Sequence, residues 1–158
     1  MRRRALLVLA GVALLAGCAG EAPSQTVYVM RHLHTPEGVT DAELTPEGHA
    51  AARTLAAQLE GQKLAAVFTT DFRRSRASVA PLLAARAMTA QLYDHRDPDA
   101  LVARIRAVEG DVLVVGHSNT VPELVEKLGG ARPAPMTHPD FGDLWVIRAG
   151  TSVRRRIG

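Results

Sequence analysis

Short apolar runs rich in β-branched residues alternate with helix-like segments along most of the chain. Residues 112–115 (VLVV) form the plainest strand pattern, and residues 26–30 (TVYVM) and 65–69 (AAVFT) follow it. Short continuous apolar runs of this kind are typical of strands buried on both faces of a sheet. Their alternation with helices predicts an α/β protein, specifically a three-layer α/β/α sandwich around a mostly parallel central sheet.

The helix-like segments have recognisable ends. Thr45-Pro46-Glu47 predicts a helix start, because threonine caps helices, proline suits the first turn and an acid is favourable there. Ala51, Leu55 and Leu59 recur every fourth residue and so give that helix one apolar face. Further helices are predicted over 74–86, 98–108 and 120–128. Pro81 is expected to kink the first of these or to delay its start, and a capping-box pattern from Thr120 to Glu123 opens the last. A strand is predicted over 88–92, and a hairpin is predicted from 144–148 with 152–157.

The first 25 residues follow a different pattern. Arg2 to Arg4 precede an apolar run over 5–16, which is shorter than the ~20 residues of a membrane-spanning helix and is typical of a secretory signal peptide. Leu15-Ala16-Gly17-Cys18 resembles the lipobox of bacterial lipoproteins. That resemblance implies cleavage before Cys18 and lipidation of its thiol. We therefore expect a leader over 1–17, a tether over 18–25 and one domain over 26–158, anchored to the membrane in the cell envelope and facing the periplasm.

Composition supports one globular domain without a polyanionic partner. The chain has 158 residues, 47% of them hydrophobic, which excludes a disordered or fibrous protein. The formal charge of +3 comes from 19 basic and 16 acidic residues. Removing the leader removes three basic residues and no acidic one, so the remainder is formally neutral and no nucleic-acid partner is expected. Cys18 is the only cysteine, so no disulfide can form within the chain.

Polar residues follow three of the predicted strands at the point where each strand ends. They are Arg31-His32-Leu33, Thr70 to Arg74, and Gly116 to Asn119. In an open α/β sheet, ligands bind beyond the carboxyl ends of the strands. Because guanidinium groups suit bidentate recognition of phosphate, arginines and histidines at this edge predict a phosphate pocket that contains imidazoles. The helix that begins near Thr120 is expected to add backbone donors.

These segments together resemble the histidine phosphatase superfamily, which has the phosphoglycerate-mutase-like fold. The resemblance spans about residues 27–128, with its motifs in the expected order and spacing. The motifs are Arg31-His32-Leu33, Leu44-Thr45-Pro46-Glu47-Gly48, Thr70-Asp71-Phe72-Arg73-Arg74-Ser75 and Gly116-His117-Ser118.

The resemblance implies a role for each matched residue. His32 would be the nucleophile that becomes phosphohistidine, while Arg31, Arg74 and His117 would bind the phosphoryl group. Asn119 is an additional candidate for phosphate binding, and the resemblance implies no metal and no cofactor. The residue types suit this chemistry, since a neutral imidazole is a good nucleophile and positioned cations stabilise charge on phosphoryl oxygens.

The chain departs from the family pattern at three points. Leu33 replaces the glycine of the first motif, and His34 stands where an acidic residue often follows. The glutamate-bearing stretch of the mutases is not recognisable, so Asp94 is the first candidate for the general acid and His34 the second. The remaining histidines carry no assigned role: His49 and His95 are expected to be solvated surface residues, and His138 lies in a proline-rich loop.

The favoured function is a lipid-anchored, extracytoplasmic phosphatase that hydrolyses small phosphomonoesters, or phosphohistidine, through His32. One alternative is a lipoprotein that binds a phosphorylated ligand without catalysis because it lacks a competent acid. A second alternative is a metal site formed by His32, His34 and His117, although it leaves the two arginines unexplained.

Overall fold

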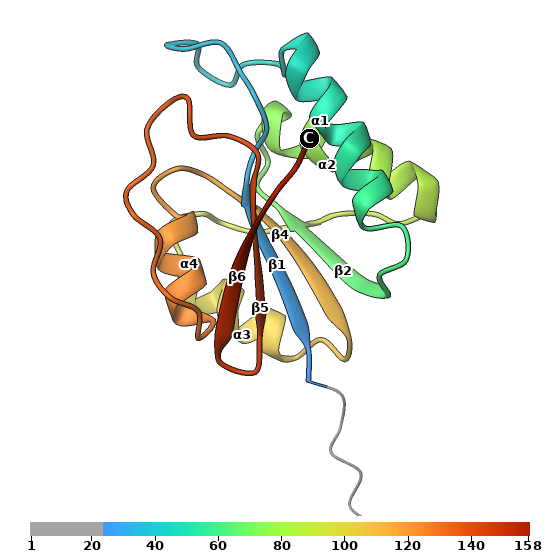
Figure 1. Ribbon diagram of the computed structural model, residues 1–158, viewed down its shortest axis with the longest axis vertical. Coiled ribbons are helices and arrows are strands. Elements are labelled where there is room, and N and C mark those ends of the chain that lie inside the picture. The colour runs from blue at the N-terminus through green and yellow to red at the C-terminus, as the bar shows by residue number, and fades with distance from the viewer. Residues whose placement is uncertain (1–23) are drawn as a thin grey trace, which may run out of the picture.

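The structure is a computed structural model that describes residues 24–158 (Figure 1). The expected leader and the lipidation site Cys18 lie outside this range. Within it, every helix is too short or too polar to span a bilayer. The described part of the chain forms a single α/β unit.

One six-stranded sheet forms the centre of the molecule. Its strand order is β3-β2-β4-β1-β5-β6. The pairs β1–β4, β4–β2 and β2–β3 are parallel, whereas β5 pairs antiparallel with both β1 and β6. The mostly parallel sheet expected from the sequence is therefore confirmed. The strands are β1 (Thr26–Arg31), β2 (Leu64–Thr69), β3 (Gln91–Leu92), β4 (Asp111–Gly116), β5 (Asp143–Arg148) and β6 (Thr151–Arg156).

Four helices complete the sandwich. They are α1 (Pro46–Gln58), α2 (Arg73–Arg86), α3 (Pro98–Arg106) and α4 (Val121–Lys127). Helices α1 and α2 cover one face of the sheet, and α3 and α4 cover the other (Figure 1). The three-layer α/β/α architecture is thus the one predicted.

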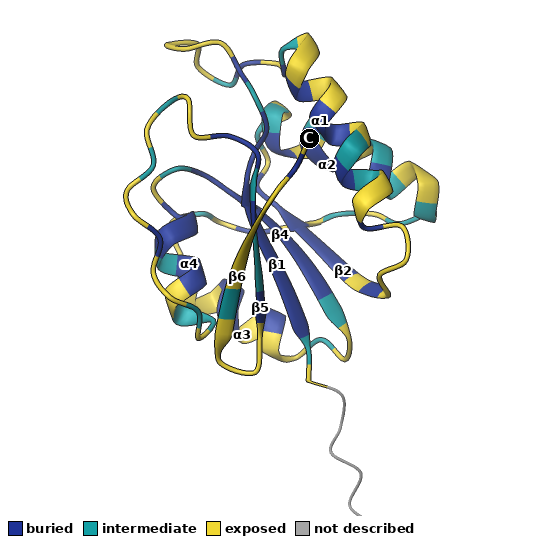
Figure 2. Ribbon diagram, in the orientation of Figure 1, coloured by how far each residue is buried: buried dark blue, intermediate teal, exposed yellow. Residues whose placement is uncertain are grey.

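Alternating residues of the central strands divide the core into two halves. Met30 and Val115 pack with Leu55 of α1 on one face, while Val29 and Val114 belong to the cluster on the opposite face, beneath α3 and α4. Figure 2 shows that most of each of these strands is buried. Because both faces of the sheet are covered by helices, its central strands reach solvent only at their ends, and the polar motifs lie there.

Several element boundaries differ from those predicted. Helix α2 begins at Arg73 and continues through Pro81 to Arg86, so the proline does not delay its start. Strand β3 has two residues where five were predicted. The capping box at Thr120 is wrong, because the Thr120 side chain makes no capping bond to α4. Its Oγ1 instead accepts the N–H of His117 at 2.9 Å, which tightens the turn after β4.

Candidate active site

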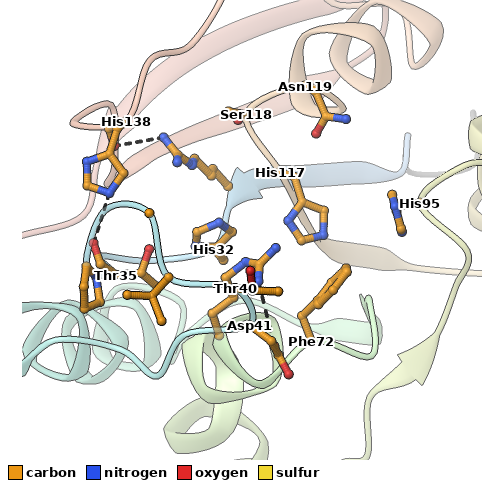
Figure 3. Close-up of a pocket in the computed structure, with 15 residues that line it drawn as sticks. His32, Thr35, Thr40, Asp41, Phe72, His95, His117, Ser118, Asn119 and His138 are labelled. Carbon is orange, nitrogen blue, oxygen red and sulfur yellow. Dashed lines mark hydrogen bonds and ion pairs between the residues drawn. The ribbon is translucent and has the colours of Figure 1, made fainter.

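Two histidines leave the sheet side by side because their strands are parallel neighbours in register. Arg31 at the end of β1 lies opposite Gly116 at the end of β4, and the N–H of His32 donates to the Gly116 carbonyl at 2.9 Å. The next residues of the two strands, His32 and His117, therefore meet, with ring centroids 5.5 Å apart (Figure 3).

A cavity of about 500 Å³ opens beyond these strand ends. Its wall is formed by the segment after β1, the start of α2, the turns after β3 and β4, and the loop before β5, so residues distant in sequence surround one space (Figure 3). Its chemistry is that of an anion site lined with imidazoles, and Asp41 is the one carboxylate among the described lining residues. The arginine and histidine side chains that line the cavity are Arg31, His32, Arg74, His95, His117 and His138.

The side chain of His32 is held as a neutral imidazole. Its Nδ1 lies 2.9 Å from the Leu33 carbonyl, and because a carbonyl only accepts, Nδ1 carries the proton and Nε2 keeps its lone pair. Burial, together with the charges of Arg31 and Arg74, lowers the pKa of His32 to about 4. At neutral pH the imidazole is uncharged. The Leu33 side chain, which replaces the family's glycine, is fully buried in the core and leaves the cavity unobstructed.

Two hydroxyl groups, of Thr70 and Ser75, orient the ring of His117 through hydrogen bonds. Thr70 Oγ1 donates to Ser75 Oγ at 2.9 Å, so its lone pair receives the proton of His117 Nε2 at 3.0 Å. Burial and the nearby His32 hold the pKa of His117 at about 3. Among the described residues, Nδ1 has no hydrogen-bond partner. A phosphoryl oxygen beside Nδ1 would favour protonation there and turn His117 into a charged donor.

Arg31 joins the cavity to the loop that precedes β5. Its Nη1 donates to the carbonyls of Thr137, His138 and Asp140 at 2.6, 3.1 and 3.3 Å, and its guanidinium lies 4.1 Å from the ring centroid of Phe141. Within residues 24–158, Nε is buried without a partner. One edge of the guanidinium is therefore occupied by the loop, while the residue also lines the cavity.

Arg74 and Arg73 face different environments. Arg74 lines the cavity, where its guanidinium stacks 4.3 Å from the Phe72 ring centroid and its Nη1 lies 3.8 Å from Asp41 Oδ1. The Arg73 side chain is 62% exposed and pairs with Glu43. The structure thus brings to the cavity the arginine that the motif spacing favoured.

The two residues predicted as general acids do not line the cavity. The carboxylate of Asp94 accepts hydrogen bonds from the Arg96 guanidinium and backbone, and these bonds hold its pKa well below the usual range. A carboxyl group so held is a poor proton donor. His34 lies against Phe141, with ring centroids 4.9 Å apart, and its Nε2 is 3.4 Å from Glu47. The geometry gives neither prediction support.

Two histidines that the sequence left without a role do line the cavity. His95 was expected on the solvated surface, yet its ring lies 5.6 Å from the rings of both Phe72 and His117. His138 lines the opposite side, where its Nε2 is 3.2 Å from the Thr35 carbonyl. His95 follows the end of β3 closely, so the strand-end rule that singled out His32 and His117 applies to it as well.

The turn after β4 differs in detail from the prediction. Asn119 is exposed on the rim of the cavity, next to Ser118. The partner that orients His117 is Thr70, and the described residues show no hydrogen bond between Asn119 and His117. The N–H groups of Thr120 and Val121 both donate to the His117 carbonyl, so these expected donors are already used.

Only two of the three histidines of the alternative metal site meet, namely His32 and His117. His34 lies outside the cavity lining, and residues 24–158 contain no group of three or more His, Cys, Asp or Glu side chains arranged to hold a metal ion. The cavity instead presents cationic and imidazole donors, which suit an anion.

Comparisons with known proteins agree with this geometry. The family model for the histidine phosphatase superfamily (branch 1) matches residues 25–96. No curated protein matches the chain significantly. Among solved structures, the protein histidine phosphatase SixA complexed with tungstate is 18% identical, with a TM-score of 0.63 over 83% of this chain and 94% of its own.

Two further structures share the fold. A putative phosphohistidine phosphatase SixA from Nakamurella multipartitia is 26% identical, with a TM-score of 0.58 over 83% of this chain and 88% of its own. A mycobacterial glucosyl-3-phosphoglycerate phosphatase with bound inorganic phosphate is 16% identical, with a TM-score of 0.60 over 77% and 88% of the respective chains. The domain therefore has the phosphoglycerate-mutase-like fold.

Proposed function

We propose that this chain is a phosphatase of the histidine phosphatase superfamily and that it forms a phosphohistidine on His32, a proposal supported by the family match over residues 25–96 and by the fold. The observation that carries the proposal is the state of His32. Its ring proton is held on Nδ1 by the Leu33 carbonyl, which leaves Nε2 as a neutral nucleophile beside two arginines.

The first half of the reaction transfers the phosphoryl group to the enzyme. The Nε2 lone pair attacks phosphorus, the bond from phosphorus to the leaving group breaks, and the leaving group takes that electron pair. Arg31 and Arg74 neutralise charge on the phosphoryl oxygens. His117, protonated on Nδ1 in the presence of the phosphoryl group, donates a further hydrogen bond.

The second half returns the enzyme to its starting state. Water attacks the phosphorus of phospho-His32, the phosphorus–nitrogen bond breaks, and Nε2 recovers its lone pair as phosphate leaves. The phosphoramidate bond is labile, so one difficult hydrolysis becomes two easier steps. Every charge used in this scheme comes from protein side chains, and we therefore expect activity to survive EDTA and to be blocked by vanadate.

The substrate class is a small phosphorylated compound, either a phosphomonoester or phosphohistidine. The cavity is large enough for a phosphoryl group and a compact organic moiety. The structurally similar proteins are described as acting on protein phosphohistidine or on glucosyl-3-phosphoglycerate, and both of these are phosphorylated substrates.

A trapping experiment tests the phosphoenzyme. Wild-type protein is mixed briefly with a ³²P-labelled phosphomonoester and quenched in alkali, in which phosphohistidine survives. We expect label on wild-type protein and none on His32→Gln, with steady-state turnover by His32→Gln reduced at least about 1,000-fold. The matched control is His49→Gln, because His49 is exposed on α1. Equal turnover by wild type and His32→Gln would refute the mechanism.

The absence of both predicted acids from the cavity favours one other candidate, a lipoprotein that binds a phosphorylated ligand without turning it over. Such a protein would bind phosphate and vanadate through Arg31 and Arg74 but would show neither a product burst nor labelled His32. The trapping experiment above therefore separates the two functions.

We also propose that the mature protein is lipid-anchored in the cell envelope and faces the periplasm. Support comes from the Arg2 to Arg4 cluster, the apolar run after it and the lipobox-like residues that end at Cys18. Metabolic labelling with a fatty acid in a bacterial host tests this. We expect label and membrane fractionation for wild type, and loss of both for Cys18→Ser. Equal labelling of the two proteins would contradict the anchor.

A further inference from the structure

We propose that His95 is the proton donor to the leaving group, which suits the site to phosphomonoesters of ordinary alcohols; this inference rests on the proposed phosphatase function. An alcohol leaves poorly as an alkoxide, so its oxygen needs a proton as the bond to phosphorus breaks. The two acids expected from the sequence lie outside the cavity, and His95, which was assigned no role, lies inside it.

The position of His95 matches the geometry of in-line transfer. The rings of His32, His117 and His95 lie in that order across the cavity (Figure 3), with successive centroids 5.5 and 5.6 Å apart. In phosphoryl transfer the attacking and leaving atoms are roughly in line with phosphorus. With His32 attacking and His117 beside the phosphoryl group, the leaving oxygen points away from His32, toward the side that His95 occupies.

The turn that carries His95 is firmly held. The Tyr93 hydroxyl donates to the Val115 carbonyl at 2.9 Å in the core, and the Tyr93 N–H donates to the Thr69 carbonyl at 3.0 Å. On the other side, Asp94 accepts the N–H of Arg96 at 2.9 Å. His95 is the tip between these two fixed points, so its ring is aimed at the cavity by the backbone.

The ring of His95 is free to exchange a proton. No hydrogen bond among residues 24–158 occupies either of its nitrogens. Asp94 Oδ1 lies 3.9 Å from Nδ1, within ion-pair distance of a protonated imidazole. The side chain is 36% exposed, which allows contact with substrate and reprotonation from solvent. Asp94 thus becomes a positioning residue, and the donor is its neighbour.

The other titratable groups of the lining are already engaged. Asp41 Oδ1 accepts the N–H of Arg73 at 2.8 Å and faces the guanidinium of Arg74, which makes it an acceptor. His138 lies across the cavity from His95 in Figure 3, with Nε2 beside the Thr35 carbonyl. His95 is the remaining imidazole on the leaving-group side.

The proposed proton transfer balances over one turnover. In the first step a ring nitrogen of His95 gives its proton to the leaving oxygen as the Nε2–phosphorus bond of His32 forms and the phosphorus–oxygen bond breaks, releasing a neutral alcohol. In the second step neutral His95 accepts a proton from the attacking water as the phosphorus–nitrogen bond breaks. His95 is then protonated again.

Leaving-group dependence tests this role. Wild type, His95→Gln and the surface control His49→Gln are assayed with 4-nitrophenyl phosphate, whose leaving group needs no proton, and with glycerol 2-phosphate, whose leaving group does. We expect His95→Gln to lose about 100- to 10,000-fold in kcat/KM on glycerol 2-phosphate and less than about fivefold on 4-nitrophenyl phosphate. The retained activity on 4-nitrophenyl phosphate shows that the variant is folded.

The outcomes separate this inference from the proposed function. If His95→Gln loses the same factor on both substrates, or loses activity on neither, the proton-donor role is overturned while labelling of His32 in the wild type still supports the phosphatase. If wild type neither hydrolyses 4-nitrophenyl phosphate nor becomes labelled, the phosphatase function itself fails, and the role of His95 fails with it. A partial return of activity on glycerol 2-phosphate in His95→Glu would support the inference further.

Discussion

At the scale of single residues, the cavity distinguishes side chains that are adjacent in sequence. Arg73 and Arg74 have the same charge, but only Arg74 is half-buried, lines the cavity with His32 and stacks on Phe72. Asp94 and His95 differ in the same way, since one is tied to Arg96 and the other lines the cavity. The position of each residue on the backbone decides which member of the pair lines the cavity.

This contrast predicts the effect of exchanging arginine for lysine. Lysine keeps the charge but loses the planar fork that holds two phosphoryl oxygens. We expect Arg74→Lys to lower kcat/KM about 10- to 100-fold, the equivalent of a charge-assisted hydrogen bond of about 1.5–3 kcal/mol, and Arg73→Lys to change it less than about twofold. Steady-state assays on 4-nitrophenyl phosphate measure both. A larger loss in Arg73→Lys would reverse the assignment.

At the scale of elements, the start of α1 packs directly on the segment after β1. Thr45 caps the helix by accepting the Gly48 N–H at 3.1 Å, and the Thr45 N–H donates to the His34 carbonyl at 2.9 Å. A Cβ at Gly48 would lie 2.5 Å from that same carbonyl. Glycine at this point of the Leu-Thr-x-x-Gly motif therefore permits the close approach that positions the cavity wall.

We expect Gly48→Ala to destabilise the fold even though alanine is the better helix former. The clash is with backbone, which cannot rotate away, and should cost about 1–3 kcal/mol in the free energy of unfolding. Gly61→Ala is the control, because nothing lies within 4 Å of a Cβ there, and we expect a change within about 0.5 kcal/mol. Urea denaturation of the three proteins decides, and equal midpoints would refute the packing argument.

The elements also show what sequence can predict. Strands, helices and strand-end motifs are local patterns, so the parallel sheet and the meeting of His32 with His117 follow from them. The role of Thr70 in orienting His117 and the contacts of Arg31 with the loop at 137–140 depend on chain segments that meet only in the fold. The strand before His95 was predicted, but which side chain of the turn after it enters the cavity depends on how that turn packs in the fold, through contacts such as that of Tyr93 with Val115.

At the scale of the whole molecule, burying two histidines makes stability depend on pH. Their pKa values in the folded protein are about 4 for His32 and about 3 for His117, below the unfolded value of about 6.5. At pH values between the folded and the unfolded pKa of each histidine, the unfolded chain binds a proton that the folded protein does not. Stability is therefore greatest above about pH 6.5 and is lost as the pH falls toward 4.

Urea unfolding at several pH values tests this linkage. Each histidine should lower the free energy of unfolding by up to about 1.4 kcal/mol per pH unit between pH 6.5 and 4.5. We expect His32→Gln and His117→Gln each to flatten the pH dependence, because glutamine does not titrate. His49→Gln, changed at an exposed site, should keep the wild-type slope. Identical slopes in all four proteins would show that the buried imidazoles do not control acid sensitivity.

The guanidinium of Arg31 has two edges, and this creates a thermodynamic coupling between segments that are more than 100 residues apart in sequence. Its Nη1 donates to three carbonyls of the loop before β5, and the same residue lines the cavity in which the phosphoryl group is proposed to bind. If ordering of the loop favours phosphate binding by a given free energy, phosphate binding favours ordering of the loop by the same free energy. Occupancy of a site built on the first strand is thus communicated to residues 137–140 through one side chain.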